Sequence, residues 1–215
     1  MIDRYQEIQR RIADACASVG RDPSSVTLIA VSKTYPASAI QELYDLGHRD
    51  FGESRLQELI PKWEELPKDI RWHFIGKLQS NKTKRAAEIS HAIHTIETTS
   101  QLKELNKSKD NVNVFIEVNI AEEEQKSGIL QKSLDTFTQD VIRCEQANLS
   151  GLMTIGPVVK DPEQSRPYFK KLRQLGESIG TKNLSMGMSL DFEVGIQEGA
   201  THIRVGTLLF GARNT

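Results

Sequence analysis

Short apolar segments alternate with longer amphipathic ones along the whole chain, and this alternation constrains the fold more than any other feature. Compact apolar or β-branched runs are typical of buried strands, whereas apolar residues at helical spacing are typical of surface helices. The expected strands are residues 27–32, 48–53, 71–76, 91–97, 111–120, 149–155, 183–188 and 201–206. A helical pattern follows most of them, which indicates parallel strands joined by helices.

Strands that are apolar along nearly their whole length are covered on both faces, as in parallel sheets. About eight strand–helix units favour a closed barrel, because open doubly wound sheets more often have about five or six strands. The chain has 215 residues, which is near the lower end for such barrels. No linker or low-complexity segment divides it. We therefore predict a single α/β domain over residues 1–215, a (β/α)8 TIM barrel with an extra N-terminal helix within residues 2–19.

Charge and composition narrow the classes of function. Lys and Arg total 28 and Asp and Glu total 29, which gives a formal net charge of −1. Nucleic-acid-binding proteins usually show a basic excess, and a membrane span needs about 20 apolar residues, so we expect neither partner. The first residues are charged and do not resemble a signal peptide. Cys16 and Cys144 lie far apart, which fits a reducing compartment. We expect a cytoplasmic protein, and a monomer because the helices have ordinary amphipathic faces.

Lys33 is the sharpest single candidate for chemistry. It directly follows the apolar strand 27–32, and active sites of these barrels lie at the C-terminal ends of the strands. A lysine that is partly desolvated and close to other cations has a lowered pKa, which frees its amine to attack a carbonyl carbon. The alternative is a lysine whose charged end reaches solvent from a strand end.

The ends of the last two strands suggest a phosphate site. Barrels of this kind often bind phosphate through the loops after strands seven and eight. Here Ser185 and Ser189 supply hydroxyl groups, and Gly206 with Thr207 opens the last helical turn, where backbone N–H groups can face an anion. Alternatively, these residues only cap helices and form turns.

Arg204 lies two residues before Gly206 and therefore shares its face of the strand. It is either a ligand contact or a salt-bridged rim residue. The histidines give no metal-binding pattern, since His91 and His94 fall in an expected strand, where residues three apart face opposite sides. We predict no metal site and expect hydrogen-bonded histidines instead.

Seven long stretches, in order over nearly the whole chain, resemble the pyridoxal phosphate homeostasis protein family, also called the YggS or PROSC family. They are LIAVSKTYPA, DFGESR, WHFIGKLQSNK, FIEVNIAEEEQKSG, LSGLMTIGP, SMGMSLDF and THIRVGTLLFGAR. The resemblance implies a barrel similar to the N-terminal domain of alanine racemase, with pyridoxal 5′-phosphate (PLP) as cofactor. One departure is Ser54, which stands where the family usually has an asparagine near the cofactor.

The resemblance also implies roles for individual residues. Lys33 matches the lysine that forms a Schiff base with PLP, and Arg204 matches the arginine that faces the pyridine nitrogen. The positions that match phosphate contacts are Ser185, Gly206 and Thr207. Further contacts are expected from Ser54, Met186 and Ser189.

Three functions compete. The first is reversible PLP binding through Lys33 for storage or delivery, with free PLP and apo PLP enzymes as partners and no robust enzymatic activity. The second is a PLP-dependent amino-acid racemase, which needs a second acid–base group on the other face of the cofactor. The third is a barrel enzyme for another phosphorylated metabolite. We expect binding, because Tyr35 is a poor second base, an arginine at the ring nitrogen disfavours its protonation, and the barrel leaves no residues for a domain that would cover its mouth.

Overall fold

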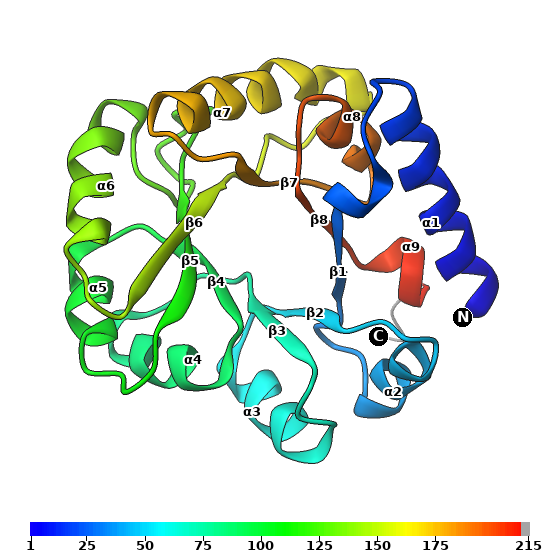
Figure 1. Cartoon of the computed structure of the whole chain (residues 1–215), viewed down its shortest axis with the longest axis horizontal. Helices are drawn as coiled ribbons and strands as arrows, with labels where there is room; N and C mark the ends of the chain where they lie inside the picture. Colours follow the sequence, from blue (N-terminus) through cyan, green and yellow to red (C-terminus); the bar gives the residue numbers. More distant parts are fainter. Residues whose placement is uncertain (212–215) are drawn as a thin grey trace.

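The protein is a closed barrel of eight parallel strands in the order β1 to β8, with β8 pairing back onto β1. The computed structural model describes residues 1–211. The strands are β1 (Thr27–Val31), β2 (Asp50–Glu53), β3 (Arg71–Phe74), β4 (Ala92–Ile96), β5 (Val112–Glu117), β6 (Ala147–Met153), β7 (Asn183–Met188) and β8 (His202–Val205). Figure 1 looks into the barrel, and the predicted (β/α)8 fold is confirmed.

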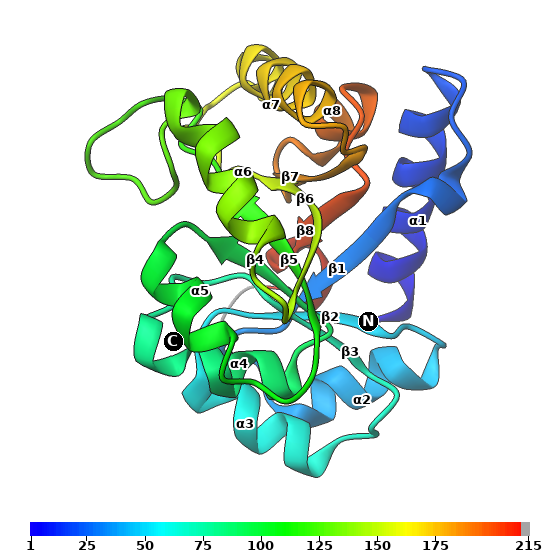
Figure 2. The same ribbon diagram turned by 60° about the vertical axis from the view of Figure 1, so that its left-hand side comes forward.

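Helices form a ring around the barrel, as Figures 1 and 2 show from two directions. The helices are α1 (Ile2–Ala17), α2 (Ala37–Asp45), α3 (Leu56–Glu65), α4 (Thr83–Ile89), α5 (Thr99–Leu105), α6 (Leu134–Ile142), α7 (Arg166–Ser178), α8 (Phe192–Gln197) and α9 (Thr207–Phe210). The helix α9, which follows β8, is only 4 residues long. The predicted N-terminal helix α1 packs against α8 and α9 and completes the ring there.

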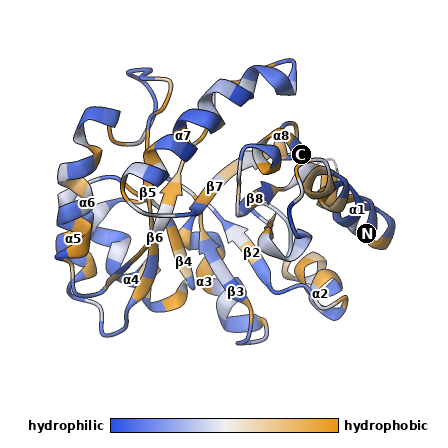
Figure 3. Cartoon of the chain, turned by 45° about the horizontal axis from the view of Figure 1, so that its top comes forward, coloured by the Kyte–Doolittle hydropathy of each residue, from blue (hydrophilic) through white to orange (hydrophobic). Residues whose placement is uncertain are grey.

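The main core lies between the sheet and the helices. Apolar side chains on the inner faces of the helices pack against the outward-facing residues of the strands. The helices carry both hydrophobic and hydrophilic residues, as the colouring of Figure 3 shows. On α1 the buried residues are Ile8, Ile12, Ala15 and Cys16, which recur at helical spacing. No helix in residues 1–211 is long and apolar enough to cross a membrane.

The barrel interior is unusually polar. A small apolar cluster of Ala92, Phe115 and Met153 occupies part of it, separate from the main core. Other interior positions of neighbouring strands carry histidine, serine and arginine side chains, among them the buried residues His94, Ser185 and Arg204. Because buried polar groups must find hydrogen-bond partners, these side chains are expected to bond to one another.

Candidate functional site

A cavity of about 360 Å³ opens at the C-terminal ends of the strands. This volume lies within the range of about 300–1,000 Å³ that is usual for small-molecule sites. The cavity is lined by Val31, Lys33, Tyr35, Ile75, Ile155, Met188, Ser189, Leu190, Arg204, Gly206 and Thr207. We call it the Lys33 cavity. It therefore joins residues from both ends of the chain at the barrel mouth.

Lys33 lies in a tight turn that begins directly after β1. The amide of Tyr35 donates a hydrogen bond of 3.0 Å to the carbonyl oxygen of Ser32, which closes the turn. Thr34, in the third position, has φ = 70°, a conformation that is a genuine outlier for a β-branched residue. Such strain costs about 1–3 kcal/mol and is typically found at functional sites.

Ser189, Gly206 and Thr207 all line the Lys33 cavity. The amide of Gly206 donates to the Ser189 hydroxyl oxygen at 3.3 Å, which joins the loop after β7 to the end of β8. Gly187 has φ = 88°, and a Cβ atom there would lie 3.0 Å from the Cα of Phe192. This glycine lets α8 start close to the end of β7, which places Ser189 beside Gly206.

Arg204 extends from β8 into the barrel interior beneath the cavity and is 5% exposed. Its guanidinium donates to the Ser185 hydroxyl at 2.7 Å and to the carbonyl oxygen of Thr154 at 2.9 Å. Burial lowers the pKa of Arg204 to about 10, and the negative charges of Glu117 and Asp191 act against this. Arg204 therefore keeps its positive charge at neutral pH.

Ser185 is fully buried and does not line the Lys33 cavity. Its side chain faces the barrel interior, where its hydroxyl also lies 2.9 Å from Nδ1 of His94. Nε2 of His94 lies 2.9 Å from Nδ1 of His73, and Nε2 of His73 lies 3.0 Å from Oδ1 of Asp50. A continuous chain of hydrogen bonds thus runs from Arg204 through the barrel to β2. Sequence analysis expects hydrogen-bonded histidines but does not predict this chain.

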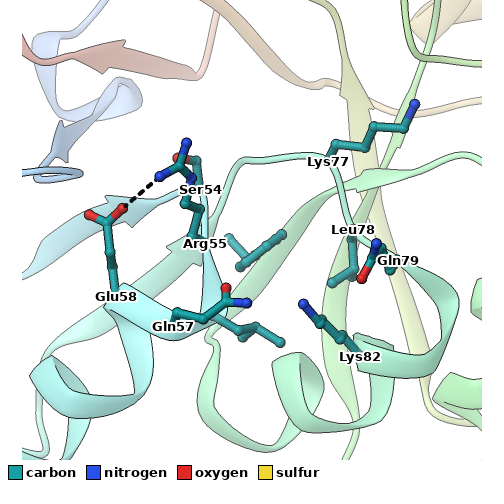
Figure 4. Close-up of a pocket in the computed structure, with 10 residues that line it drawn as sticks. Ser54, Arg55, Gln57, Glu58, Lys77, Leu78, Gln79 and Lys82 are labelled. Atoms are coloured by element: carbon teal, nitrogen blue, oxygen red, sulfur yellow. Dashed lines mark ion pairs between the residues drawn. The ribbon is translucent and has the colours of Figure 1, made fainter.

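Two further predicted residues lie elsewhere. The Met186 side chain is fully buried in the main core between the sheet and the helices, because it faces away from the barrel interior. Ser54 lines a neighbouring cavity of about 600 Å³ at the ends of β2 and β3 (Figure 4). The cations of that cavity are Arg55, Lys77 and Lys82.

Glu117 is a buried acidic residue near Arg204 that sequence analysis does not single out. It ends β5, it is 4% exposed, and its Oε2 has no hydrogen-bond partner in the described part of the chain. Burial, and next the charge of Glu97, raise the pKa of Glu117 to about 7, although Arg204 and Lys77 act in the opposite direction. A carboxyl group that titrates near neutral pH close to Arg204 is a functional candidate. The only sequence signal is a lone carboxylate within the apolar strand expected at residues 111–120.

Known proteins show the same organisation. The sequence model of "Alanine racemase, N-terminal domain" matches residues 4–214. A pyridoxal phosphate homeostasis protein of Aquifex aeolicus is 40% identical over 98% of this chain and 97% of the relative. The protein of the same name from Escherichia coli is also 40% identical, over 97% of this chain and 94% of the relative.

Solved structures agree with these sequence matches. PipY of Synechococcus elongatus, solved with PLP bound, has 35% sequence identity and a TM-score of 0.80, and the match covers 93% of this chain and all of PipY. Alanine racemase of Corynebacterium glutamicum has a TM-score of 0.71 at 14% identity, over 95% of this chain and 62% of the racemase. That second likeness concerns the fold alone.

Proposed function

Because the chain belongs to the pyridoxal phosphate homeostasis protein family, we propose that it holds PLP reversibly through Lys33 and stores or delivers the cofactor without robust enzymatic activity. Free PLP and apo PLP enzymes are its proposed partners. We further propose that it acts as a monomer in the cytoplasm, where its two free, buried cysteines stay reduced.

The Lys33 cavity fits PLP, which is the cofactor of this family. PLP supplies an aldehyde carbon that a lysine amine attacks with loss of water, and the Lys33 side chain lines a cavity of suitable size. The Ser189 hydroxyl and the backbone of Gly206 and Thr207 line the same cavity and offer contacts for a phosphate group. The presence of a lysine and of these polar groups in one cavity is the observation that carries the proposal.

Ser185 has a different place in this proposal from the one its sequence position suggests. Because its hydroxyl already serves Arg204 and His94 in the interior, we assign the direct phosphate contact to Ser189. Ser185 then supports the cofactor indirectly, by fixing the guanidinium that faces the ring.

Arg204 argues for binding rather than catalysis. A permanent positive charge facing the pyridine nitrogen disfavours protonation of that nitrogen, because two cations repel. An unprotonated ring withdraws electrons weakly, whereas transamination-type chemistry needs strong withdrawal. Racemisation by two bases would need a second group on the opposite cofactor face. Tyr35 is a poor candidate for it, because its hydroxyl donates to the carbonyl oxygen of Gly211 at 2.7 Å and its ring stacks on Phe210.

Absorption spectroscopy tests the proposal. We expect the purified protein to take up PLP, to absorb visible light, and to become covalently labelled at Lys33 after borohydride reduction. Lys33→Ala should lose the absorbance, while Lys132→Ala, an exchange of another lysine outside the cavity, should retain it. A wild type that takes up no PLP would exclude both PLP functions and leave an enzyme for another phosphorylated metabolite. Sustained conversion of L-alanine to D-alanine would favour the racemase.

A further inference from the structure

The residues of the turn that carries Lys33 do not favour the conformation that the turn adopts. Thr34 has a positive φ, and Lys33 beside it does not. A positive φ at the third position alone is the pattern of a type II turn, which favours glycine or asparagine there. A β-branched threonine in this place needs contacts from outside the turn.

Helix α3 provides these contacts on both sides of Lys33. Oε2 of Glu58 accepts a hydrogen bond of 2.7 Å from the amide of Thr34, the residue after the lysine. Nζ of Lys62 donates a hydrogen bond of 3.0 Å to the carbonyl oxygen of Ser32, the residue before it. Glu58 and Lys62 are four residues apart and therefore lie on one face of the helix.

The α3 contacts are themselves anchored to the sheet. Nζ of Lys62 also lies 2.7 Å from Oε1 of Glu53, and the Ser32 hydroxyl donates to the same oxygen at 2.7 Å. Glu53 is the last residue of β2 and is fully buried. The Glu58 carboxylate also pairs with Arg55, whose Nη1 lies 3.9 Å from Oε1 of Glu58. The dashed line in Figure 4 marks this ion pair. The helix, β2 and the turn after β1 are thus joined by charged groups.

We propose that Glu58 and Lys62 are positioning residues, which fix the backbone on either side of Lys33 and so direct its amine into the cavity. The inference rests on the proposed role of Lys33. Fixing the backbone limits the directions that a flexible lysine side chain can take, and such preorganisation favours reaction with a bound aldehyde. Glu58 does this by stabilising a conformation that Thr34 would otherwise avoid.

A double-mutant cycle between Glu58 and Thr34 tests this role. The first readout is the rate at which apo protein mixed with PLP gains visible absorbance, and the second is hydrogen exchange at residue 34. We expect Glu58→Ala to slow the gain of absorbance by roughly tenfold and to speed hydrogen exchange at residue 34, because one charge-assisted hydrogen bond is lost. Glu58→Gln keeps an acceptor oxygen and should recover most of the rate. Glu65→Ala, at the exposed end of α3, is the matched control and should behave as wild type.

The Thr34→Gly background separates positioning from general damage. Glycine adopts positive φ freely. Glu58→Ala should therefore slow the gain of absorbance much less in this background than in the wild type. Equal slowing in both backgrounds, or Glu58→Ala behaving as wild type in both readouts, would overturn the proposal. If even the wild type gains no absorbance, the proposed function fails, yet the exchange of the residue 34 amide still decides whether Glu58 holds the turn.

Discussion

His73 and His94 meet ring to ring inside the barrel, with Nδ1 of the first 2.9 Å from Nε2 of the second. The residues at the two ends of this hydrogen-bond chain determine which group donates at each step. An arginine only donates, so Arg204 donates to Ser185, and a carboxylate only accepts, so Asp50 accepts from Nε2 of His73. If both rings are neutral, each carries its proton on Nε2, and every donor in the chain points from Arg204 toward Asp50.

A neutral His94 ring agrees with the electrostatics of the chain. Burial, and next the neighbouring His73, lower the pKa of His94 well below its ordinary value. Burial acts to raise the pKa of Asp50, but hydrogen bonds from Arg71 and His73 outweigh it, so this carboxyl stays ionised. A negative group at one end and the Arg204 cation at the other thus orient the intervening dipoles.

Ser185→Ala should mainly lower stability, whereas Ser189→Ala should mainly weaken PLP binding. Ser185→Ala leaves the guanidinium of Arg204 and Nδ1 of His94 each without one partner, so we expect it to lower the free energy of unfolding by about 2 kcal/mol. Ser189→Ala should leave unfolding almost unchanged but weaken PLP binding, because this hydroxyl lines the cavity. Urea titration and PLP titration of both variants provide the check. A large loss of PLP affinity for Ser189→Ala is required, and its absence would return the phosphate role to Ser185.

The protein should lose stability on mild acidification. Burial lowers the pKa of four histidines, and His202 reaches about 3; the four are His48, His91, His94 and His202. The unfolded chain binds protons at these rings near pH 6.5, whereas the folded chain does not, so the free energy of unfolding falls as the pH drops below about 6.5. Each such histidine adds a slope of up to about 1.4 kcal/mol per pH unit.

Urea titrations between about pH 7.5 and pH 4.5 measure this slope. His202→Gln should reduce this slope by the share of one histidine, up to about 1.4 kcal/mol per pH unit, since a glutamine does not titrate in this range. An unchanged slope in the variant would mean that His202 titrates in the folded protein as it does in the unfolded chain.

The fold could be predicted because its determinant is local. Most strands are short runs rich in apolar residues, and most are followed by a segment with helical spacing, so the eight units are visible without knowledge of contacts. The observed bounds differ only at the ends. The sixth strand is expected at residues 149–155 but spans Ala147–Met153, because strand ends depend on pairing with neighbours and not on the residues alone.

The site could be predicted only where strand ends determine it. Lys33 comes shortly after β1, Arg204 lies in β8 and Gly206 directly follows β8, and the three residues line one cavity. Ser185 has the same kind of position, yet its hydroxyl lies in the interior, because the turn at Gly187 brings the later Ser189 to the cavity. The partners of Thr34 and of His94 come from other elements, and no spacing in the sequence indicates such contacts.

Glu117→Gln should stabilise the protein most at alkaline pH. Burial raises the pKa of Glu117 to about 7, so the folded state resists its ionisation, while the unfolded chain ionises near pH 4.5. The wild type therefore carries a penalty that is absent at pH 4.5, grows as the pH rises, and is complete above about pH 7. It amounts to at most on the order of 3 kcal/mol.

We expect the difference in unfolding free energy between Glu117→Gln and wild type to follow that course. Infrared spectroscopy gives an independent check, because a protonated carboxyl band should disappear from the wild type as the pH rises through 7 and should be lacking in the variant. A stability difference that stays constant from pH 5 to pH 8 would show that Glu117 titrates normally.

Lys62→Met should be among the most damaging single exchanges outside the cavity. Lys62 bonds to the fully buried Glu53 at 2.7 Å, and burial raises the pKa of that carboxyl even though Lys62 acts to lower it. Removing the lysine leaves an uncompensated buried charge, which costs about 3–5 kcal/mol. The double variant Glu53→Gln with Lys62→Met removes the charge as well, while the amide that replaces the carboxylate still offers an oxygen to the Ser32 hydroxyl. We expect it to regain at least half of the loss in urea titrations. A double variant as unstable as Lys62→Met would show that the lost bond to the Ser32 carbonyl or the packing of the lysine stem, and not the unpaired charge, accounts for the loss.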